Sequence, residues 1–250
     1  MKIIKPWIPF YKKYEAALAR VSALEMVLSV MLESPKFIFS DMVGFNGQLH
    51  RKSIFLELNK MFNFDVIVET GTFIGDTTGY FASVTDIPIL TCEFRKLFQS
   101  LAKSRLQSIE KIRFTVGDSR QFLREILEGK TDGKQFSKMA FFYLDAHWHE
   151  DLPLKDELQI IVKYLENFII MVDDFQVPHD AGYGWDDYGR NKALNLETFK
   201  KLLDKLKLKP YFPNLPSAQE SGGKRGCVIL VPEGKINHQL QDVKTISSVK

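Results

Sequence analysis

The stretch FFYLDAHWHEDLPL, residues 141–154, joins a strand-like segment to a cluster of polar groups. Its first residues are aromatic or apolar and suit a strand in a protein core. They run directly into Asp145, His147, Trp148, His149 and Glu150. Such groups are costly to bury without partners, so we expect this strand to end at a site where they serve a purpose.

Similar apolar runs recur on both sides of this stretch. We predict strands over residues 64–69, 87–93, 111–117, 139–145 and 168–174, with KPYF and CVILVP as a final pair. Helices are predicted between them, over residues 49–62, 76–83, 94–108, 119–127, 154–165 and 191–208. This alternation is typical of βαβ units and a parallel sheet.

The predicted fold class is therefore α/β, with a doubly wound, mostly parallel seven-stranded sheet of the Rossmann-like kind. We assign it to residues 48–235, after an N-terminal helical extension (1–47) and before a C-terminal tail (236–250). In the extension, apolar residues at spacings of four and three form a helical seam: Ala17, Val21, Leu24, Leu28 and Met31. The seam packs on the main domain, covers the site as a lid or forms a homodimer contact.

Composition excludes several classes of function. The net charge is +3, with 34 basic and 31 acidic residues interspersed, so we expect no nucleic-acid partner. Cys92 and Cys227 form no CxxC pair, which argues against a disulfide framework or a zinc knuckle. The chain shows no secretion signal and no apolar run long enough for a membrane span. We expect a cytoplasmic protein with no membrane partner.

Parallel strands place their carboxyl ends at one edge of the sheet, where α/β folds bind ligands. The first strand is followed by a glycine turn containing Gly71 and Gly75, whose spacing differs from both GxGxxG and the P-loop. Glu93 ends the second strand, 22 residues after Gly71, where an acid can bind ribose hydroxyls. Asp118 follows the third strand and either faces an adenine amino group or caps the next helix.

The fourth and fifth predicted strands end in carboxylates. Asp145 follows one, and Asp173 and Asp174 follow the other. If these strands are neighbours, three like charges converge, and a divalent cation such as Mg²⁺ relieves the repulsion. In the alternative, Asp145 or Asp173 caps a helix or pairs with a lysine.

Together, ETGTFIG, Glu93 and GDS (residues 117–119) resemble the cofactor site of class I S-adenosylmethionine-dependent methyltransferases, over about residues 64–235. The resemblance implies that Glu69 and Gly71 contact the methionine portion, Glu93 the ribose, and Asp118 with Ser119 the base. It extends the cofactor contacts to neighbouring positions: Thr70, Thr72, Gly75, Thr77, Phe94 and Asp145.

Two metal-dependent groups share further motifs. LDAHW (residues 144–148) resembles the LDHW of catechol O-methyltransferases, with one residue more. VETG (68–71) and VDDF (172–175) resemble the macrocin O-methyltransferase type. The resemblance implies S-adenosylmethionine and Mg²⁺ as cofactors, with Asp145, Asp173 and Asp174 as metal ligands. It also implies O-methylation of a small hydroxylated acceptor, a sugar or secondary metabolite.

A proton acceptor is expected beside the metal. Catechol enzymes use a lysine just after their motif, and His149 stands near that place here. Imidazole titrates near neutrality, so we predict His149 as the base, with His147 as the second candidate and Asp145 as a further catalytic residue.

Two loops follow the predicted site. Residues 176–192 form either a substrate rim or lid, with Trp185 and Tyr188 stacking on the acceptor, or a structural loop. Residues 217–226 carry Lys224 and Arg225, which either meet an acidic substrate or keep a sheet edge soluble.

Other functions fit the same fold. One is a hydroxylase- or hydrolase-like enzyme whose histidines and carboxylates bind a redox metal. Another is a module that binds a nucleoside without turnover. Fold class alone does not separate them.

Overall fold

The computed structural model describes residues 14, 21, 43–129, 139–147, 151–189 and 191–248. The chain divides into two compact units, Met1–Val43 and Gly44–Lys250, and the second carries all the described strands. The predicted helical seam lies outside the described residues apart from Val21, and so does the homodimer or lid contact proposed for it.

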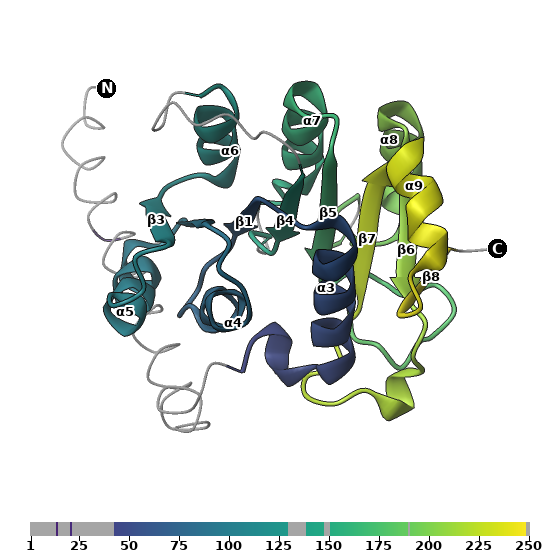
Figure 1. Cartoon of the computed structure of the whole chain (residues 1–250), viewed down its shortest axis with the longest axis horizontal. Helices are drawn as coiled ribbons and strands as arrows, with labels where there is room; N and C mark the ends of the chain where they lie inside the picture. Colours follow the sequence, from purple (N-terminus) through teal and green to yellow (C-terminus); the bar gives the residue numbers. More distant parts are fainter. Residues whose placement is uncertain are drawn as a thin grey trace, which may run out of the picture. The chain divides into compact units, whose positions relative to one another are not determined.

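A single mixed sheet organises the described part of the second unit (Figure 1). Its order is β3-β2-β1-β4-β5-β7-β6-β8. The pairs from β3 to β5 are parallel, whereas β7, β6 and β8 join as antiparallel strands. The strands are β1 (Val66–Thr70), β2 (Ile89–Glu93), β3 (Ile112–Val116), β4 (Ala140–Leu144), β5 (Phe168–Asp173), β6 (Leu208–Pro213), β7 (Cys227–Pro232) and β8 (Ile246–Ser248). The α/β class and the mostly parallel sheet are confirmed.

The strand count corrects the prediction. The described residues form eight strands rather than seven, because β8 adds to the outer edge of β6. The segment predicted as a C-terminal tail thus contributes a strand, and α9 (Lys235–Gln239) begins at its boundary. A three-residue strand is too short to show a sequence period, and only the open edge of β6 gives it partners.

Helices cover both faces of the sheet. The main ones are α3 (Leu49–Phe62), α4 (Asp76–Val84), α5 (Lys96–Leu106), α6 (Ser119–Leu127), α7 (Leu154–Tyr164) and α8 (Leu196–Leu206). One hydrophobic cluster packs α6, α7 and α8 on the sheet, and another packs α3, α4 and α9 on the opposite face. The predicted helix 191–208 begins later than expected, because the side chain of Asn195 caps it by accepting the N–H of Thr198 at 2.9 Å.

The central strands are buried on both faces, which explains their continuous apolar runs. On β4, Phe142 belongs to the α7 side, whereas Phe141 belongs to the α3 side. The ring of Phe55, from α3, lies 5.1 Å from that of Phe141 and 4.8 Å from that of Phe81. This aromatic packing fixes α3 and α4 over the middle of the sheet.

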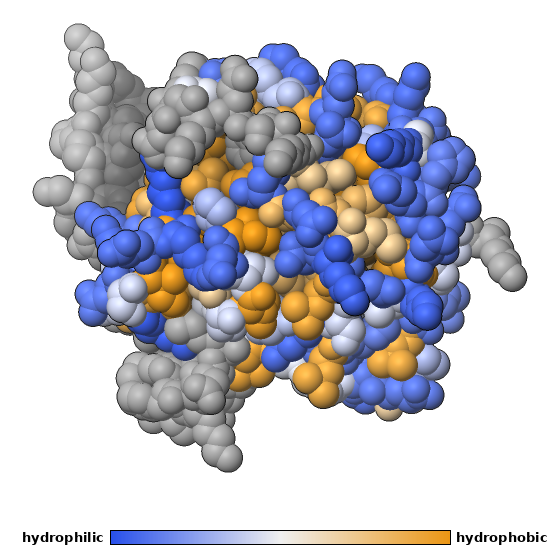
Figure 2. Space-filling view, in the orientation of Figure 1, coloured by the Kyte–Doolittle hydropathy of each residue, from blue (hydrophilic) through white to orange (hydrophobic). Residues whose placement is uncertain are grey.

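The outer surface mixes both kinds of side chain. Figure 2 shows hydrophilic residues over α8 and α9 and interspersed hydrophobic residues over α3 and α4. Leu49 and Leu56 of α3 are among the exposed large hydrophobic residues. Scattered exposure of this kind is ordinary for a globular domain. Among the described residues, no helix combines the length and apolar character needed to span a bilayer.

One acid is buried under the sheet edge between two helices. Glu157 of α7 is 1% exposed, and its burial raises its pKa to about 7, although a hydrogen bond from Ser119 of α6 offsets part of this effect. The folded chain therefore holds a proton that an unfolded chain releases near pH 4.5. This contribution to stability is full below that pH and is lost as the pH rises through 7.

We therefore expect Glu157→Gln to flatten the dependence of stability on pH. Relative to this variant, the wild type should lose about 1–3 kcal/mol of unfolding free energy between pH 5 and pH 8. Urea unfolding at both pH values measures the difference. Glu166→Gln, at an exposed position, is the control. Its unfolding free energy should change between the two pH values by as much as that of the wild type. Parallel pH curves for the wild type and Glu157→Gln would contradict the buried-proton interpretation.

Candidate active site

The carboxyl ends of five parallel strands lie side by side, as the sequence predicts. Thr70 at the end of β1 is in register with Cys92 of β2 and Leu144 of β4. Leu144 is in turn in register with Val172 of β5. The loops after these strands therefore share one edge, and they carry the predicted cofactor and metal residues.

The glycine turn after β1 packs directly against the end of β4. Gly71 has a φ of +86°, and a Cβ there would lie 2.1 Å from the backbone oxygen of Asp145. Gly75 has a φ of +87°, and its Cβ would lie 3.1 Å from the Cβ of Ala102 on α5. Both positions thus need glycine for conformation and for space. At the start of α4, the hydroxyl of Thr77 accepts the N–H of Phe45 at 3.1 Å.

Glu69 lies beneath this turn as a buried acid. Its Oε2 accepts hydrogen bonds from the hydroxyls of Thr78 and Thr91, the latter at 2.6 Å. Its Oε1 has no hydrogen-bond partner among the described residues. Burial raises the pKa of Glu69 to about 7, although the two hydroxyls offset part of this effect. An open acceptor oxygen remains under the turn.

Glu93 at the end of β2 closes the turn from the other side. Its two carboxylate oxygens accept the backbone N–H groups of Phe73 at 2.9 Å and Arg95 at 2.8 Å. Burial raises the pKa of Glu93, and these hydrogen bonds counteract the rise. Phe94, next in the chain, is 74% exposed and offers an apolar face beside this carboxylate.

Asp118 caps α6, so one of the two roles left open by the sequence is confirmed. Its Oδ1 accepts the N–H of Arg120 at 2.8 Å, and the Arg120 guanidinium pairs with the same carboxylate. The hydrogen bond from the Arg120 side chain is the main cause of the lowered pKa of Asp118. Any contact with an adenine would have to share this carboxylate with Arg120.

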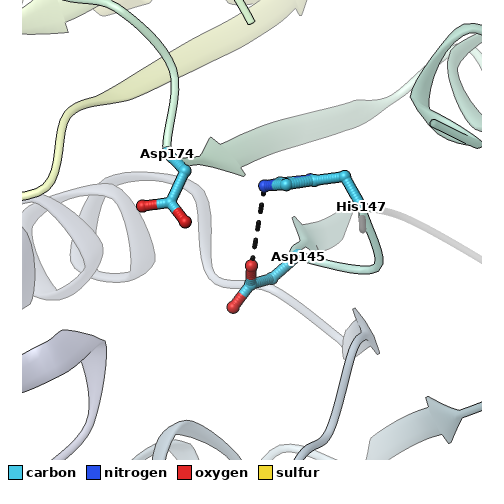
Figure 3. A group of neighbouring side chains, drawn as sticks. All are labelled: Asp145, His147 and Asp174. Atoms are coloured by element: carbon cyan, nitrogen blue, oxygen red, sulfur yellow. Dashed lines mark ion pairs between the residues drawn. The ribbon is translucent and has the colours of Figure 1, made fainter. Parts of the chain in front are cut away.

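Asp145, His147 and Asp174 meet at the ends of β4 and β5. One ligand atom of each lies within 4.8 Å of the others, and Figure 3 shows the three side chains turned toward one another. The Nε2 of His147 lies 3.7 Å from Asp145 Oδ1, too far for a hydrogen bond. That nitrogen is buried and has no hydrogen-bond partner among the described residues.

Burial is the main cause of the shifted pKa values in this group. Desolvation and the charges of Asp173 and Asp174 raise the pKa of Asp145 well above its usual range. Desolvation and Asp173 raise the pKa of Asp174 to about 7, although Arg225 acts against them. Burial lowers the pKa of His147, which favours a neutral ring that is ready to donate a lone pair.

Asp173, predicted as a further metal ligand, is not among the three residues whose ligand atoms group together, although its charge acts on both Asp145 and His147. Its carboxylate forms a buried ion pair with Arg51 of α3 and accepts the Tyr143 hydroxyl at 2.6 Å. It also accepts the N–H of Asp174 at 2.8 Å. Burial alone would raise the pKa of Asp173, but Arg51 and Tyr143 outweigh it and lower the pKa. Asp173 is thus already paired with protein groups.

Sequence reasoning missed Arg51 and Tyr143. Arg51 occupies the buried face of α3 at helical spacing from Ile54, Phe55 and Leu58. A basic residue at such a position was a signal that it meets a buried acid. Tyr143 lies on β4 two residues before Asp145, and alternation along a strand is the signal that would have placed the two side chains on the same face.

Arg225 joins the two loops that flank the site. Its guanidinium pairs with Asp174 at 2.5 Å and with Asp186. The backbones of Gly184 and Arg225 form a bridge, and the side chain of Asp180 accepts the N–H of Ser217 at 2.6 Å. These contacts favour a structured rim for residues 176–189.

The remaining predicted positions are only partly described. Trp185 and Tyr188 are half-buried on the rim, and the Tyr188 hydroxyl donates to Asp186. Trp148, His149 and Glu150 lie outside the described residues, so the predicted base is not placed. Lys224, which precedes Arg225 in the chain, has a φ of +49°.

Comparison with known proteins identifies the fold. No protein-family model and no curated protein matches the sequence. Among solved structures, the O-methyltransferase TomG from Streptomyces achromogenes, in complex with SAM, has a TM-score of 0.50 and 16% identity. That match covers 74% of this chain and 80% of TomG. The methyltransferase domain of bacterial CtHen1-CN has a TM-score of 0.51 and 11% identity, over 73% of this chain and 97% of that domain.

At sequence identities of 11–16%, the similarity to these structures establishes the fold alone. The chain has the fold of class I S-adenosylmethionine-dependent methyltransferases, so the predicted Rossmann-like methyltransferase fold is confirmed. At the outer edge of the sheet, β8 pairs with β6.

The close packing of Gly71 on Asp145 is directly testable. Gly71→Ala should lower the free energy of unfolding by about 3 kcal/mol or more, because the added Cβ meets backbone that cannot yield easily. The matched control is Gly129→Ala. Gly129 also has a positive φ, +71°, but its Cβ would meet no atom of the described residues within 4 Å. That change should cost about 1 kcal/mol. Equal losses in chemical denaturation would show that space at Gly71 is not limiting.

Proposed function

We propose that this chain is an S-adenosylmethionine-dependent methyltransferase that methylates an oxygen of a small hydroxylated acceptor with the help of a divalent cation. The observation that carries the proposal is that the loops after the parallel strands share one edge of the sheet. This edge holds Glu69, Gly71 and Glu93 on the β1–β2 side and Asp145, His147 and Asp174 on the β4–β5 side. TomG, named as an O-methyltransferase, has the same fold.

The cofactor residues have complementary chemistry. S-adenosylmethionine, when bound, supplies a methyl group activated on a sulfonium. In our proposal, the carboxylate of Glu93 accepts the ribose hydroxyls and the exposed ring of Phe94 packs on the adenine. The unpartnered Oε1 of Glu69 and the glycine turn face the methionine portion. Ser119 and Asp118 lie on the base side, with Asp118 shared with Arg120.

The second half of the edge fits a cation. Two carboxylates lie within reach of each other, and a buried imidazole nitrogen has no partner among the described residues; a metal ion would satisfy all three groups. A bound divalent ion would orient an acceptor hydroxyl and lower its pKa. Asp145 and Asp174 supply its oxygen ligands in our proposal, and His149 accepts the proton of the acceptor.

The acceptor is proposed to be a sugar or a secondary metabolite. The rim that Arg225 holds beside Asp174 presents Trp185 and Tyr188 at half-buried positions, and such rings suit stacking on a sugar or an aromatic ring. Positioning the acceptor oxygen in line with the methyl group then accounts for much of the acceleration.

Binding of the demethylated cofactor tests the proposal. S-adenosylhomocysteine should bind the wild type in calorimetry. Glu93→Gln should weaken binding about tenfold or more, because hydrogen bonds to a charged group contribute about 1.5–3 kcal/mol. Glu166→Gln, at an exposed position, should bind like the wild type. No binding at high micromolar concentration would overturn the methyltransferase proposal, and unchanged affinity of Glu93→Gln would remove Glu93 from the ribose role.

Metal dependence is a separate expectation. With a panel of catechols and simple glycosides, S-adenosylhomocysteine release should stop in excess chelator and return when a divalent ion is added. Asp174→Asn should reduce turnover about tenfold or more, because a charged metal ligand is lost. The affinity of this variant for S-adenosylhomocysteine should change less than about threefold. Asp204→Asn, on the exposed side of α8, is the control. Full activity in chelator would exclude the metal.

A further inference from the structure

His147 is buried at the end of β4, and its Nε2 lacks, among the described residues, the hydrogen bond that a structural histidine in a protein core normally makes. It follows β4 by three residues, its side chain is 2% exposed, and its Nε2 lies 3.7 Å from the Asp145 carboxylate (Figure 3). That nitrogen has no hydrogen-bond partner among the described residues. Burial of an unpaired polar atom is costly, so a persistent orphan of this kind indicates a missing partner.

The carboxylates around it point to the same partner. One ligand atom each from Asp145, His147 and Asp174 lies within 4.8 Å of the others, a spacing that one ion can bridge after small side-chain shifts. Asp145 and Asp174 are both half-buried, so an ion could reach them from the solvent side. Arg225 engages Asp174 Oδ1 through its Nε and leaves the other oxygen of that carboxylate for a ligand.

Asp173, the other aspartate at the end of β5, is already committed. Both of its oxygens accept hydrogen bonds within the protein, one from Arg51 and the N–H of Asp174 and the other from Tyr143. Recruiting Asp173 to a metal would leave the buried guanidinium of Arg51 without its counter-charge. Among the described residues, the donor set at these strand ends is therefore two carboxylate oxygens and one imidazole nitrogen.

We propose that His147 is the third protein ligand of the metal and that the site therefore prefers a transition metal, of the Mn²⁺, Fe²⁺, Co²⁺ or Zn²⁺ class, to Mg²⁺. This inference rests on the proposed function for the presence of a metal, and it adds a ligand and the class of ion. Mg²⁺ binds oxygen donors and sheds water reluctantly. Imidazole suits the later divalent ions, whose affinity for nitrogen rises along the first transition row.

The preference for a transition metal distinguishes this site from a site whose protein ligands are all oxygen atoms. A set of three carboxylates would suit Mg²⁺ and carry three negative charges. Replacing one carboxylate by a neutral ring lowers the charge and softens the donor set, and both changes reduce affinity for a hard ion relative to a transition ion. Arg51 determines this outcome indirectly, because it withdraws Asp173 from the set.

The test uses metal binding rather than turnover. Calorimetry of the metal-free full chain with Mn²⁺ and with Mg²⁺ should give a dissociation constant about tenfold or more lower for Mn²⁺. Pulsed electron paramagnetic resonance of the Mn²⁺ complex should show modulation from a directly bound ¹⁴N nucleus. Equal affinities without nitrogen modulation would overturn the proposal, whatever the behaviour of the variants.

Two variants assign the nitrogen to His147. His147→Gln should lose the ¹⁴N modulation, and His147→Asp should reduce the Mn²⁺ over Mg²⁺ preference about tenfold by restoring an oxygen donor. His238→Gln, at an exposed position on α9, should keep both properties. Circular dichroism checks that each variant is folded. Nitrogen modulation that survives in folded His147→Gln would contradict the assignment.

Binding of S-adenosylhomocysteine, measured on the same samples, keeps the two proposals apart. A chain that binds Mn²⁺ through nitrogen but does not bind the cofactor would retain the metal site and overturn methyl transfer. A chain that binds the cofactor and prefers Mg²⁺ would retain methyl transfer and overturn the role of His147.

Discussion

The buried ion pair between Arg51 and Asp173 is the interaction on which the arrangement of the site depends. It joins α3 to the end of β5 across 122 residues of sequence. Removing one partner of such a pair usually costs about 3–5 kcal/mol, because the other charge is left buried. With Asp173 fixed by Arg51, Tyr143 and the next N–H, the chain turns at Asp174 with a φ of +53°. That turn brings the Asp174 carboxylate to Asp145 and His147.

A second constraint acts on the cofactor side of the edge. The absence of a side chain at Gly71 lets the turn after β1 pack on the backbone of Asp145. Glu93 then holds the turn through the N–H of Phe73. Asp145 thus lies between the two halves of the edge: its backbone supports the glycine turn, and its carboxylate faces His147. A methyl donor on one half and an oxygen acceptor on the other would meet beside this residue, which is the arrangement that in-line transfer requires.

The protonation states of the groups at this edge follow from their burial and from the charges around them. Burial and the neighbouring acids raise the pKa values of Asp145 and Asp174, whereas burial lowers the pKa of His147 although the charge of Asp173 acts against this. Arg225 relieves part of the excess on Asp174 and fastens the rim through Asp186. Perturbed carboxyl groups that converge with an unpaired imidazole are typical of functional sites, because structural ion pairs usually satisfy their own members. Asp173 with Arg51 is a structural pair of this kind, and the neighbouring trio is the proposed metal site.

The sequence by itself determined the α/β class, the bounds of α3 and α6, and the acids at the strand ends, because these follow from local periodicity and from the geometry of parallel strands. It did not determine β8, whose three residues form a strand only where β6 offers an open edge. Nor did it separate Asp173 from Asp174, which are identical neighbours in the chain. Their division into an anchor and an open carboxylate was decided by the tertiary structure, because only the packing of α3 on the sheet brings the charge of Arg51 to one of them.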